Sequence, residues 1–204
     1  MEANALFGIF AAFGLSASAG LNAYIPLLVI GVIAHYTDWI RLASPFDLLA
    51  NAWILILIGI LLIIEMLADK IPAVNHLNDI LQTVVRPVAG AIVFAASAHV
   101  ITHVHPLLAL ACGLLVAGGI HVVKAAAVRP AVTATTAGAG NVPVSLGEDL
   151  LATVLSILSV VVPVLVAVLL IVLVAFLIGW WWRRANHIRR DGPSPARPDS
   201  TSLH

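Results

Sequence analysis

Four long stretches of this chain contain no aspartate, glutamate, lysine or arginine. They cover residues 3–37, 48–64, 87–123 and 150–182. A helix needs about 20 apolar residues to cross a bilayer, so these stretches predict about five crossings, because the third is long enough to turn back near Pro106. Of the 204 residues, 61% are hydrophobic and 10% are charged, which excludes an ordinary soluble globular protein. We therefore expect an all-α, polytopic membrane helix bundle.

Residues that cap or break helices predict where the second and third crossings begin. Ser44 and Pro45 indicate a helix start, because serine is a good N-cap and proline fits the first helical position. This helix is expected to end near Ala68. Residues 75–85 alternate apolar and polar positions and predict a short interfacial helix, after which the next crossing begins at Pro87.

The C-terminal part of the chain predicts a last crossing followed by a tail. Ser145 and Glu148 have the spacing of a capping box, which predicts the start of this helix. The helix is expected to end at tryptophans 180–182, so that residues 1–182 form one transmembrane domain. Residues 183–204 contain five arginines and several prolines and serines, which predicts a disordered, cytoplasmic tail.

The hairpin expected over residues 87–123 brings distant charges to one side of the membrane. A hairpin returns the chain to the side that it left, so residues 65–86 and 124–149 share a side. These two segments contain five acidic and four basic residues, and such near-equality is what a paired, buried network requires. Glu65 and Asp69 share a helix face and are suited to binding a cation or proton, or to structural pairing alone. The candidate binding residues here are Glu65, Asp69, Lys70, Asp79, Gln82, Arg86, Lys124, Arg129, Glu148 and Asp149.

Two runs of small residues predict broken or re-entrant segments, near 16–26 and near 131–145. Each run joins serine or threonine to glycine, then asparagine, then proline, which is also a weak sign of internal duplication. Backbone freed by a break at membrane depth must be buried or line a wet cavity, and paired broken helices are typical of transporter sites. Alternatively, the small residues only allow close helix packing. The neutral candidate ligands are Asn22, Tyr24, Thr135, Thr136 and Asn141.

Metal, cofactor, nucleic-acid and catalytic sites are not expected. The single cysteine, Cys112, excludes an internal disulfide. His99 and His103 lie four residues apart without a nearby carboxylate. His121 is expected near the membrane surface opposite to His103, so the three histidines do not form one metal site. Acidic and basic residues both total 10, so no net charge points to nucleic acid. The motifs of phosphate loops, zinc proteases and serine hydrolases are missing, so we expect a protein that is not an enzyme.

Several of these motifs together resemble a bacterial integral-membrane family known as domain of unknown function 4126. The resemblance covers residues 5 to 175 approximately and implies one compact domain in a bacterial inner membrane, without implying a substrate. It is carried by Ala19-Gly20-Leu21-Asn22-Ala23-Tyr24 with Pro26, Glu65, Asp69-Lys70-Ile71-Pro72, Asp79, Gln82-Thr83, Arg86-Pro87 with Gly90, Gly140-Asn141-Val142-Pro143, Ser145 and Glu148-Asp149.

The first functional hypothesis is a small transporter or channel-like protein. Its polar site would lie between the two broken segments and the charged residues, and would take a small ion, a solute or an anionic lipid headgroup. The second hypothesis is a non-catalytic membrane scaffold or lipid-binding subunit, in which the same charges only hold helices together. An enzyme acting on a lipid headgroup ranks last. Assembly as a homo-oligomer is compatible with each of them.

Overall fold

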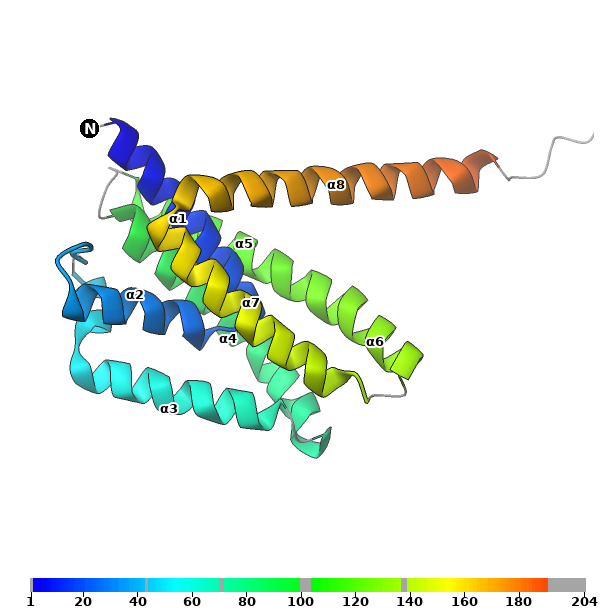
Figure 1. The fold of residues 1–204 in the computed structure, drawn as a ribbon, viewed down its shortest axis with the longest axis horizontal. Coiled ribbons are helices and arrows are strands. Elements are labelled where there is room, and N and C mark those ends of the chain that lie inside the picture. The colour runs from blue at the N-terminus through cyan, green and yellow to red at the C-terminus, as the bar shows by residue number, and fades with distance from the viewer. Residues whose placement is uncertain (1, 43, 70–71, 100–103, 137–138, 191–204) are drawn as a thin grey trace, which may run out of the picture. The chain divides into compact units, whose positions relative to one another are not determined.

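A computed structural model describes residues 2–42, 44–69, 72–99, 104–136 and 139–190 of the chain (Figure 1). All regular elements in these residues are helical, which confirms the all-α prediction. In chain order they are α1 (Glu2–Leu21), α2 (Tyr24–Tyr36), the 3-10 helix η1 (Phe46–Ala50), α3 (Ala52–Ala68), α4 (Pro72–His99), α5 (Pro106–Val123), the π-helix η2 (Lys124–Val128), α6 (Arg129–Thr136), α7 (Asn141–Val161) and α8 (Pro163–Arg190).

The chain divides into two compact units, residues 1–168 and 169–204. Helices α1 to α7 belong to the first unit, while α8 begins in the first unit and continues in the second. The predicted boundary between a transmembrane domain and a tail after residue 182 stays a prediction.

Three described segments are long and apolar enough to cross a membrane: Ile80–Ser97, Pro106–Thr136 and Asn141–Val161. Shorter apolar helices cover Phe7–Leu21, Tyr24–Tyr36, Ala52–Ala68 and Ile171–Arg183. These helices suit insertion into a membrane, as the composition predicts. The expected number of about five crossings stays a prediction.

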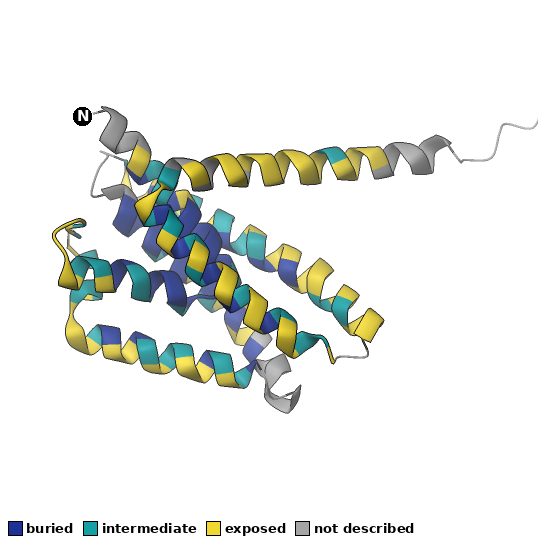
Figure 2. Cartoon of the chain, viewed as in Figure 1, coloured by how far each residue is buried: buried dark blue, intermediate teal, exposed yellow. Residues whose placement is uncertain are grey.

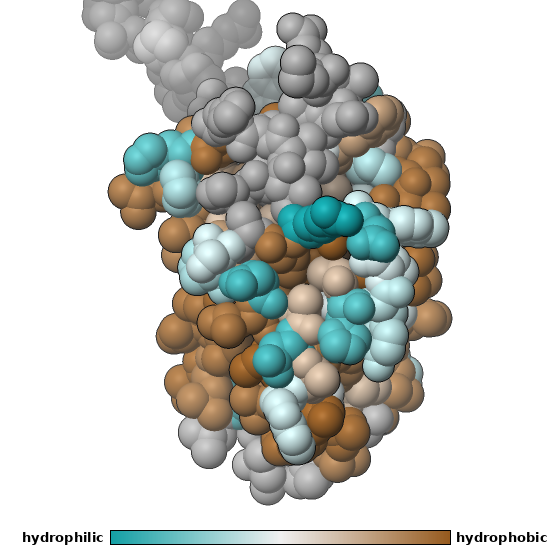
Figure 3. Space-filling view, turned by 90° about the vertical axis from the view of Figure 1, so that its left-hand side faces the viewer, coloured by the Kyte–Doolittle hydropathy of each residue, from teal (hydrophilic) through white to brown (hydrophobic). Residues whose placement is uncertain are grey.

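Helix α1 forms the centre of the first unit, where it packs against α4, α5 and α7. Figure 2 shows buried positions concentrated on α1 and α4, while the outward faces of α3, α5 and α7 are exposed. Many of these exposed side chains are large and apolar. Figure 3 shows hydrophobic residues over much of one face, with hydrophilic residues gathered in its middle. Exposed apolar faces of this kind are what lipid contact requires.

Buried serines join α1 to its neighbours. Ser18 Oγ lies 2.8 Å from the Ala152 carbonyl oxygen and 2.7 Å from Ser156 Oγ, so α1 and α7 are hydrogen-bonded side by side. Ser16 Oγ is within donating distance of two carbonyl oxygens, that of Gly90 (2.9 Å) on α4 and that of Gly113 (3.0 Å) on α5. Small side chains and hydroxyls of this type hold membrane helices at short distances.

Replacing Ser18 by alanine is expected to lower the free energy of unfolding by about 1 kcal/mol, because interhelical hydrogen bonds in membrane proteins are of this order. Denaturation by dodecyl sulfate in mixed micelles, followed by circular dichroism, measures the loss. The Ser156→Ala variant should show a similar loss, and the double variant should lose less than the two changes added together. Strict additivity would mean that the two hydroxyls do not interact.

The predicted break near 16–26 is present. Helix α1 ends at Leu21, Asn22 and Ala23 are not helical, and α2 begins at Tyr24. Pro26 does not add a second interruption, since it lies in the first turn of α2. Proline is tolerated there because the first amides of a helix have no carbonyl partner within that helix.

Two predicted helix starts are wrong. Helix α3 begins after Asn51, whose Oδ1 accepts a hydrogen bond of 2.9 Å from the Trp53 amide, and not at Ser44-Pro45, which precedes η1. Helix α7 begins at Asn141 and ends at Val161, so the last predicted helix is two helices. Ser145 does not cap α7, because the Ser145 hydroxyl donates to the carboxylate of Asp69.

The predicted interfacial helix over 75–85 and the crossing from Pro87 are one continuous helix, α4. Pro87 therefore lies inside a helix, where it removes one backbone hydrogen bond. The facing position on α5 is Gly118, at which a Cβ atom would lie 3.6 Å from Pro87 Cγ. The close packing of α4 on α1 and α5 holds the helix together through this position.

Candidate functional site

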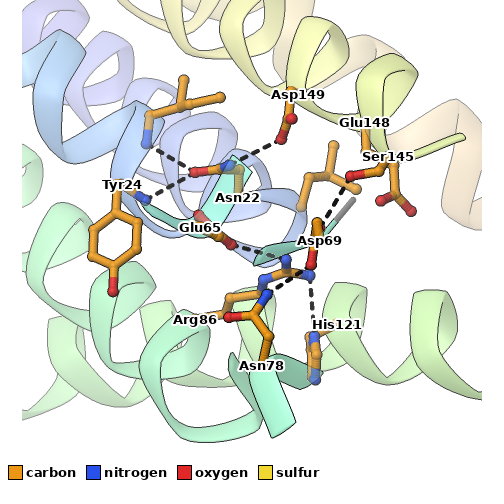
Figure 4. A network of polar contacts seen from close by, with 12 residues as sticks. Asn22, Tyr24, Glu65, Asp69, Asn78, Arg86, His121, Ser145, Glu148 and Asp149 are labelled. Carbon is orange, nitrogen blue, oxygen red and sulfur yellow. Dashed lines mark hydrogen bonds and ion pairs between the residues drawn. The ribbon is translucent and has the colours of Figure 1, made fainter. Parts of the chain in front are cut away.

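Charged side chains from five elements meet beside the break between α1 and α2 (Figure 4). We refer to them as the charged cluster. They come from the C-terminal end of α3, from α4, from η2, from α6 and from α7, so the chain returns to this place after the α4–α5 pair, as the hairpin argument predicts. The members are Glu65, Asp69, Arg86, Lys124, Arg129, Glu148 and Asp149.

Glu65 and Arg86 form the most deeply buried ion pair of the cluster. Arg86 NH2 lies 3.0 Å from Glu65 Oε1, and the two side chains are 1% and 2% exposed. Arg86 NH1 also lies 3.5 Å from Nδ1 of His121 on α5, and His121 Nε2 lies 3.2 Å from Thr83 Oγ1. A guanidinium only donates, so the contact with Arg86 requires His121 Nδ1 to be the acceptor.

Asp69, which follows the last residue of α3, joins three other parts of the fold. Its Oδ1 accepts from Asn78 Nδ2 on α4 at 2.7 Å. Its Oδ2 accepts from Ser145 Oγ on α7 at 3.0 Å and from Arg129 NH2 on α6 at 3.3 Å. Both carboxylate oxygens of Asp69 are therefore already bound by groups of the protein.

Lys124 connects η2 to α7 and to the end of α1. Its Nζ lies 2.6 Å from Glu148 Oε2 and donates to the Leu21 carbonyl oxygen at 3.2 Å. That carbonyl belongs to the last turn of α1, where the break removes the helical partner and the dipole favours a cation. Lys124 is the first residue of a π-helix, a form that is rare and frequently found at functional sites.

Asn22, at the break itself, binds both α2 and α7. Its Oδ1 accepts from the amides of Tyr24 (3.0 Å) and Ile25 (3.2 Å), which are free donors at the start of α2. Its Nδ2 donates to Asp149 Oδ1 at 2.9 Å. Asn22 is 1% exposed and Asp149 is 9% exposed. Among the described residues, no ion pair joins Asp149 to a cationic side chain.

Three buried polar atoms beside the Glu65–Arg86 pair have no hydrogen-bond partner among the described residues. They are Glu65 Oε2, Gln82 Oε1 and Arg86 Nε. Gln82 and Arg86 lie four residues apart on α4 and so occupy the same helix face. Buried polar atoms without partners are rare in proteins, and an unseen water or ligand is a common reason for them.

The structure brings together most of the predicted site residues. Asn22, Glu65, Asp69, Gln82, Arg86, Lys124, Glu148 and Asp149 are buried or nearly so, and Arg129 reaches them from α6. Tyr24 is half-buried on the first turn of α2, with its ring directed away from Asn22 (Figure 4). Lys70 lies outside the described residues, and the side chain of Asp79 is not described either.

The second broken segment is placed differently from the first. Helix α6 continues to Thr136, α7 begins at Asn141 with Pro143 in its first turn, and residues 139 and 140 form a turn, so most of the segment 131–145 is helical; residues 137 and 138 lie outside the described residues. Thr135 and Thr136 are exposed and their hydroxyls bind carbonyls of their own helix. Asn141 pairs with Thr133. These residues do not contact the charged cluster in the structure.

Asn78, Ser145 and His121 contribute to the cluster without having been candidate ligands. Ser145 has the sequence signal of a helix cap, and this signal does not predict its hydrogen bond to Asp69. His121 is three residues before Lys124, a spacing that places it beside the charges. No local pattern distinguishes Asn78 from other polar residues of the amphipathic part of α4.

Comparison with known families finds a match over most of the chain. The profile described as Domain of unknown function (DUF4126) covers residues 9–184 of the chain. No curated protein and no solved structure matches. Within the described residues, no three histidine, cysteine, aspartate or glutamate side chains are placed so that they could hold a metal ion.

Proposed function

The chain belongs to the family of domain of unknown function 4126, and from its charged cluster we propose that it is a small membrane transporter or channel-like protein. The cluster would be the site where an ion, together with small polar molecules, passes between the helices. One observation carries this proposal: three buried polar atoms of the site have no hydrogen-bond partner among the described residues.

The charges of the cluster do not cancel. It contains four carboxylates (Glu65, Asp69, Glu148 and Asp149) and three cationic side chains (Arg86, Lys124 and Arg129). The further charges of the same segments, Lys70 and Asp79, cancel each other and leave the excess of one carboxylate unchanged. An uncompensated charge costs several kcal/mol at membrane depth, so a purely structural network would be selected to be neutral. An ion taken from solution would remove the excess.

The unpartnered atoms indicate a second requirement of the site. Arg86 Nε offers a hydrogen, while Glu65 Oε2 and Gln82 Oε1 each offer an acceptor. A small molecule with a hydroxyl or amide group, or water, would satisfy all three. The break between α1 and α2 also supports a transport role, because broken helices beside ion sites are a recurrent feature of transporters.

A scaffold role is the second candidate, and the ion pairs favour it. Glu65–Arg86, Lys124–Glu148 and Arg129–Asp69 each join two different elements of the fold. For a lipid-binding subunit, Arg86 is a poor choice of ligand, because its side chain is 1% exposed. Arg129, at 18%, is the base of the cluster that a lipid headgroup would reach more easily.

The Asp149→Asn variant is expected to abolish ion flux, because it removes the excess carboxylate while keeping the size of the side chain. The measurement uses proteoliposomes with an entrapped pH-sensitive dye and a potassium diffusion potential set by valinomycin. Wild-type vesicles should acidify or alkalinise according to the sign of the potential, faster than protein-free vesicles. The variant should behave like the protein-free vesicles.

The matched control is Asp38→Asn, which makes the same chemical change at an exposed carboxylate paired with Arg41. Its flux should equal that of the wild type. Wild-type flux no faster than that of empty liposomes, both for protons and for sodium followed with an entrapped sodium-sensitive dye, would overturn the transport proposal and favour the scaffold. Equal flux in Asp149→Asn and wild type would show that the cluster is not the route.

Several further expectations complete the proposal. The protein would act without covalent catalysis, in a bacterial inner membrane, with residues 183–204 on the cytoplasmic side, because arginines prefer that side. Its partners would be lipid, a small ion or solute, and other copies of the same chain. Labelling a cysteine introduced after residue 190, in a variant whose Cys112 is replaced by alanine, in intact and opened cells tests the sidedness.

A further inference from the structure

We propose that the ion taken up at the charged cluster is a proton, and that the Asp149 carboxylate on α7 accepts it. This inference rests on the proposed function, since it names the ion that the site would bind. In this step a hydronium ion transfers its proton to one carboxylate oxygen of Asp149, so the acid becomes neutral and a water molecule remains. The cluster is then electrically balanced.

The orientation of the Asn22 amide favours a proton over a metal cation. Asn22 Oδ1 accepts from two backbone amides, those of Tyr24 and Ile25, at 3.0 and 3.2 Å. Turning the amide over would place its NH2 group against these two donors, so the orientation is fixed by the start of α2. Asn22 therefore presents a donor, and not an oxygen, to Asp149 Oδ1 at 2.9 Å.

Several other oxygens of the cluster are also bound by donors of the protein, and Glu65 Oε2 and Gln82 Oε1 are the exceptions. Both oxygens of Asp69 are bound, by Asn78, Ser145 and Arg129. The Leu21 carbonyl oxygen and Glu148 Oε2 are both within contact distance of Lys124 Nζ. A hard metal cation needs several oxygen ligands around it, and the described residues near Asp149 do not offer such a set. A proton needs only one carboxylate oxygen.

Charged groups of four elements act on Asp149. Lys124 of η2 and Arg86 of α4 attract the carboxylate charge, while Asp69 after α3 repels it. Glu148, the preceding residue of α7, is paired with Lys124 and so reduces the attraction of that lysine. The direct contact of Asp149 is the neutral Asn22 amide, which donates to the ionised carboxylate; among the described residues no cationic side chain forms an ion pair with it.

A second observation indicates how the proton reaches the cluster. Glu65 Oε2, Gln82 Oε1 and Arg86 Nε are buried and have no partner among the described residues. Together they offer one donor and two acceptors, which is what a water molecule satisfies. Water held there would bring the carrier of protons into the interior of the helix bundle.

Infrared difference spectroscopy of the full chain in lipid nanodiscs tests the proposal. Spectra at successively lower pH, recorded in H2O and in D2O, should show the C=O band of a protonated carboxyl that shifts in D2O. This band should be missing in Asp149→Asn and should remain in Asp38→Asn, in which an exposed carboxyl is lost instead. The titration should not change when choline chloride is replaced by sodium or potassium chloride.

Two results would overturn the proton assignment. One is that no carboxyl band differs between wild type and Asp149→Asn down to the pH at which the fold is lost. The other is a titration that moves to lower pH as sodium or potassium is added, which would mean that a metal cation competes for the site. Flux in proteoliposomes separates the two proposals. A carboxyl band of Asp149 in a protein that shows no flux would overturn the transport proposal only. Sodium-driven flux in a protein without this band would overturn the proton assignment only.

Discussion

The Arg86→Met variant is expected to lose about 3–5 kcal/mol of unfolding free energy, which is the typical result of removing one partner from a buried ion pair. The reason is the position of Glu65. Its carboxylate lies 3.0 Å from Arg86 NH2 and its side chain is 2% exposed, so loss of the guanidinium leaves a buried carboxylate without its cationic partner. Dodecyl sulfate titration of the purified protein, followed by circular dichroism, measures the effect.

The double variant Glu65→Leu with Arg86→Met provides the critical comparison. Replacing both partners of a buried pair by apolar side chains is often neutral, so the double variant should be much more stable than Arg86→Met alone. The exposed pair of Asp38 and Arg41 is a control, because Arg41→Met should change stability by less than about 1 kcal/mol. A double variant as unstable as the single one would mean that Arg86 stabilises the fold through packing and not through Glu65.

The gathering of the charges was predictable because it depends on topology and not on detail. A helical hairpin must return the chain to the side that it left, so Glu65 and Lys124 had to lie on one side whatever the packing between them. The same argument needs no knowledge of which acid binds which base. The individual pairs, such as Lys124 with Glu148, depend on helix rotation and required the structure.

Helix limits were less predictable where tertiary contacts outweigh local signals. Pro87 has the sequence preference of a helix start, yet α4 continues through it, because packing on two neighbouring helices offsets one lost hydrogen bond. Ser145 and Glu148 have the spacing of a capping box, yet their side chains contact Asp69 and Lys124. In both cases a local preference that holds for an isolated helix is outweighed by a tertiary contact, which is close helix packing for Pro87 and buried polar partners for Ser145 and Glu148.

The two broken segments differ for a reason that composition does not reveal. Asn22 follows a helix whose neighbours bury it, so its side chain completes the helix ends and meets Asp149. Thr135 and Thr136 lie exposed at the end of α6, and their hydroxyls bind carbonyls of their own helix. Similar runs of small residues thus have different surroundings, because burial depends on tertiary packing and not on local composition.

The Gly113→Ala variant is expected to destabilise the protein by about 2 kcal/mol or more, because added atoms in a close-packed interior force the backbone to shift. A Cβ atom at this position of α5 would meet the Gly90 carbonyl oxygen, and would lie 2.6 Å from Phe94 Cβ and 2.7 Å from the Cα atom of Ala91. Two of these three atoms belong to the α4 backbone, so they cannot move as the end of a flexible side chain can. Separation of the helices would also weaken the hydrogen bonds of Ser16.

Gly119→Ala is the matched control on the same helix. A Cβ atom at Gly119 has no neighbour within 4 Å, so the substitution adds no contact and its effect is limited to the better helix propensity of alanine. Dodecyl sulfate titration should therefore show a clear loss for Gly113→Ala and none for Gly119→Ala. Since α4 and α5 together position Arg86, His121 and Lys124, the Gly113 variant should also lose ion flux, whereas Gly119→Ala should retain it. Equal stability of the two variants would contradict the close approach of α4 and α5 on which the placement of the charged cluster depends.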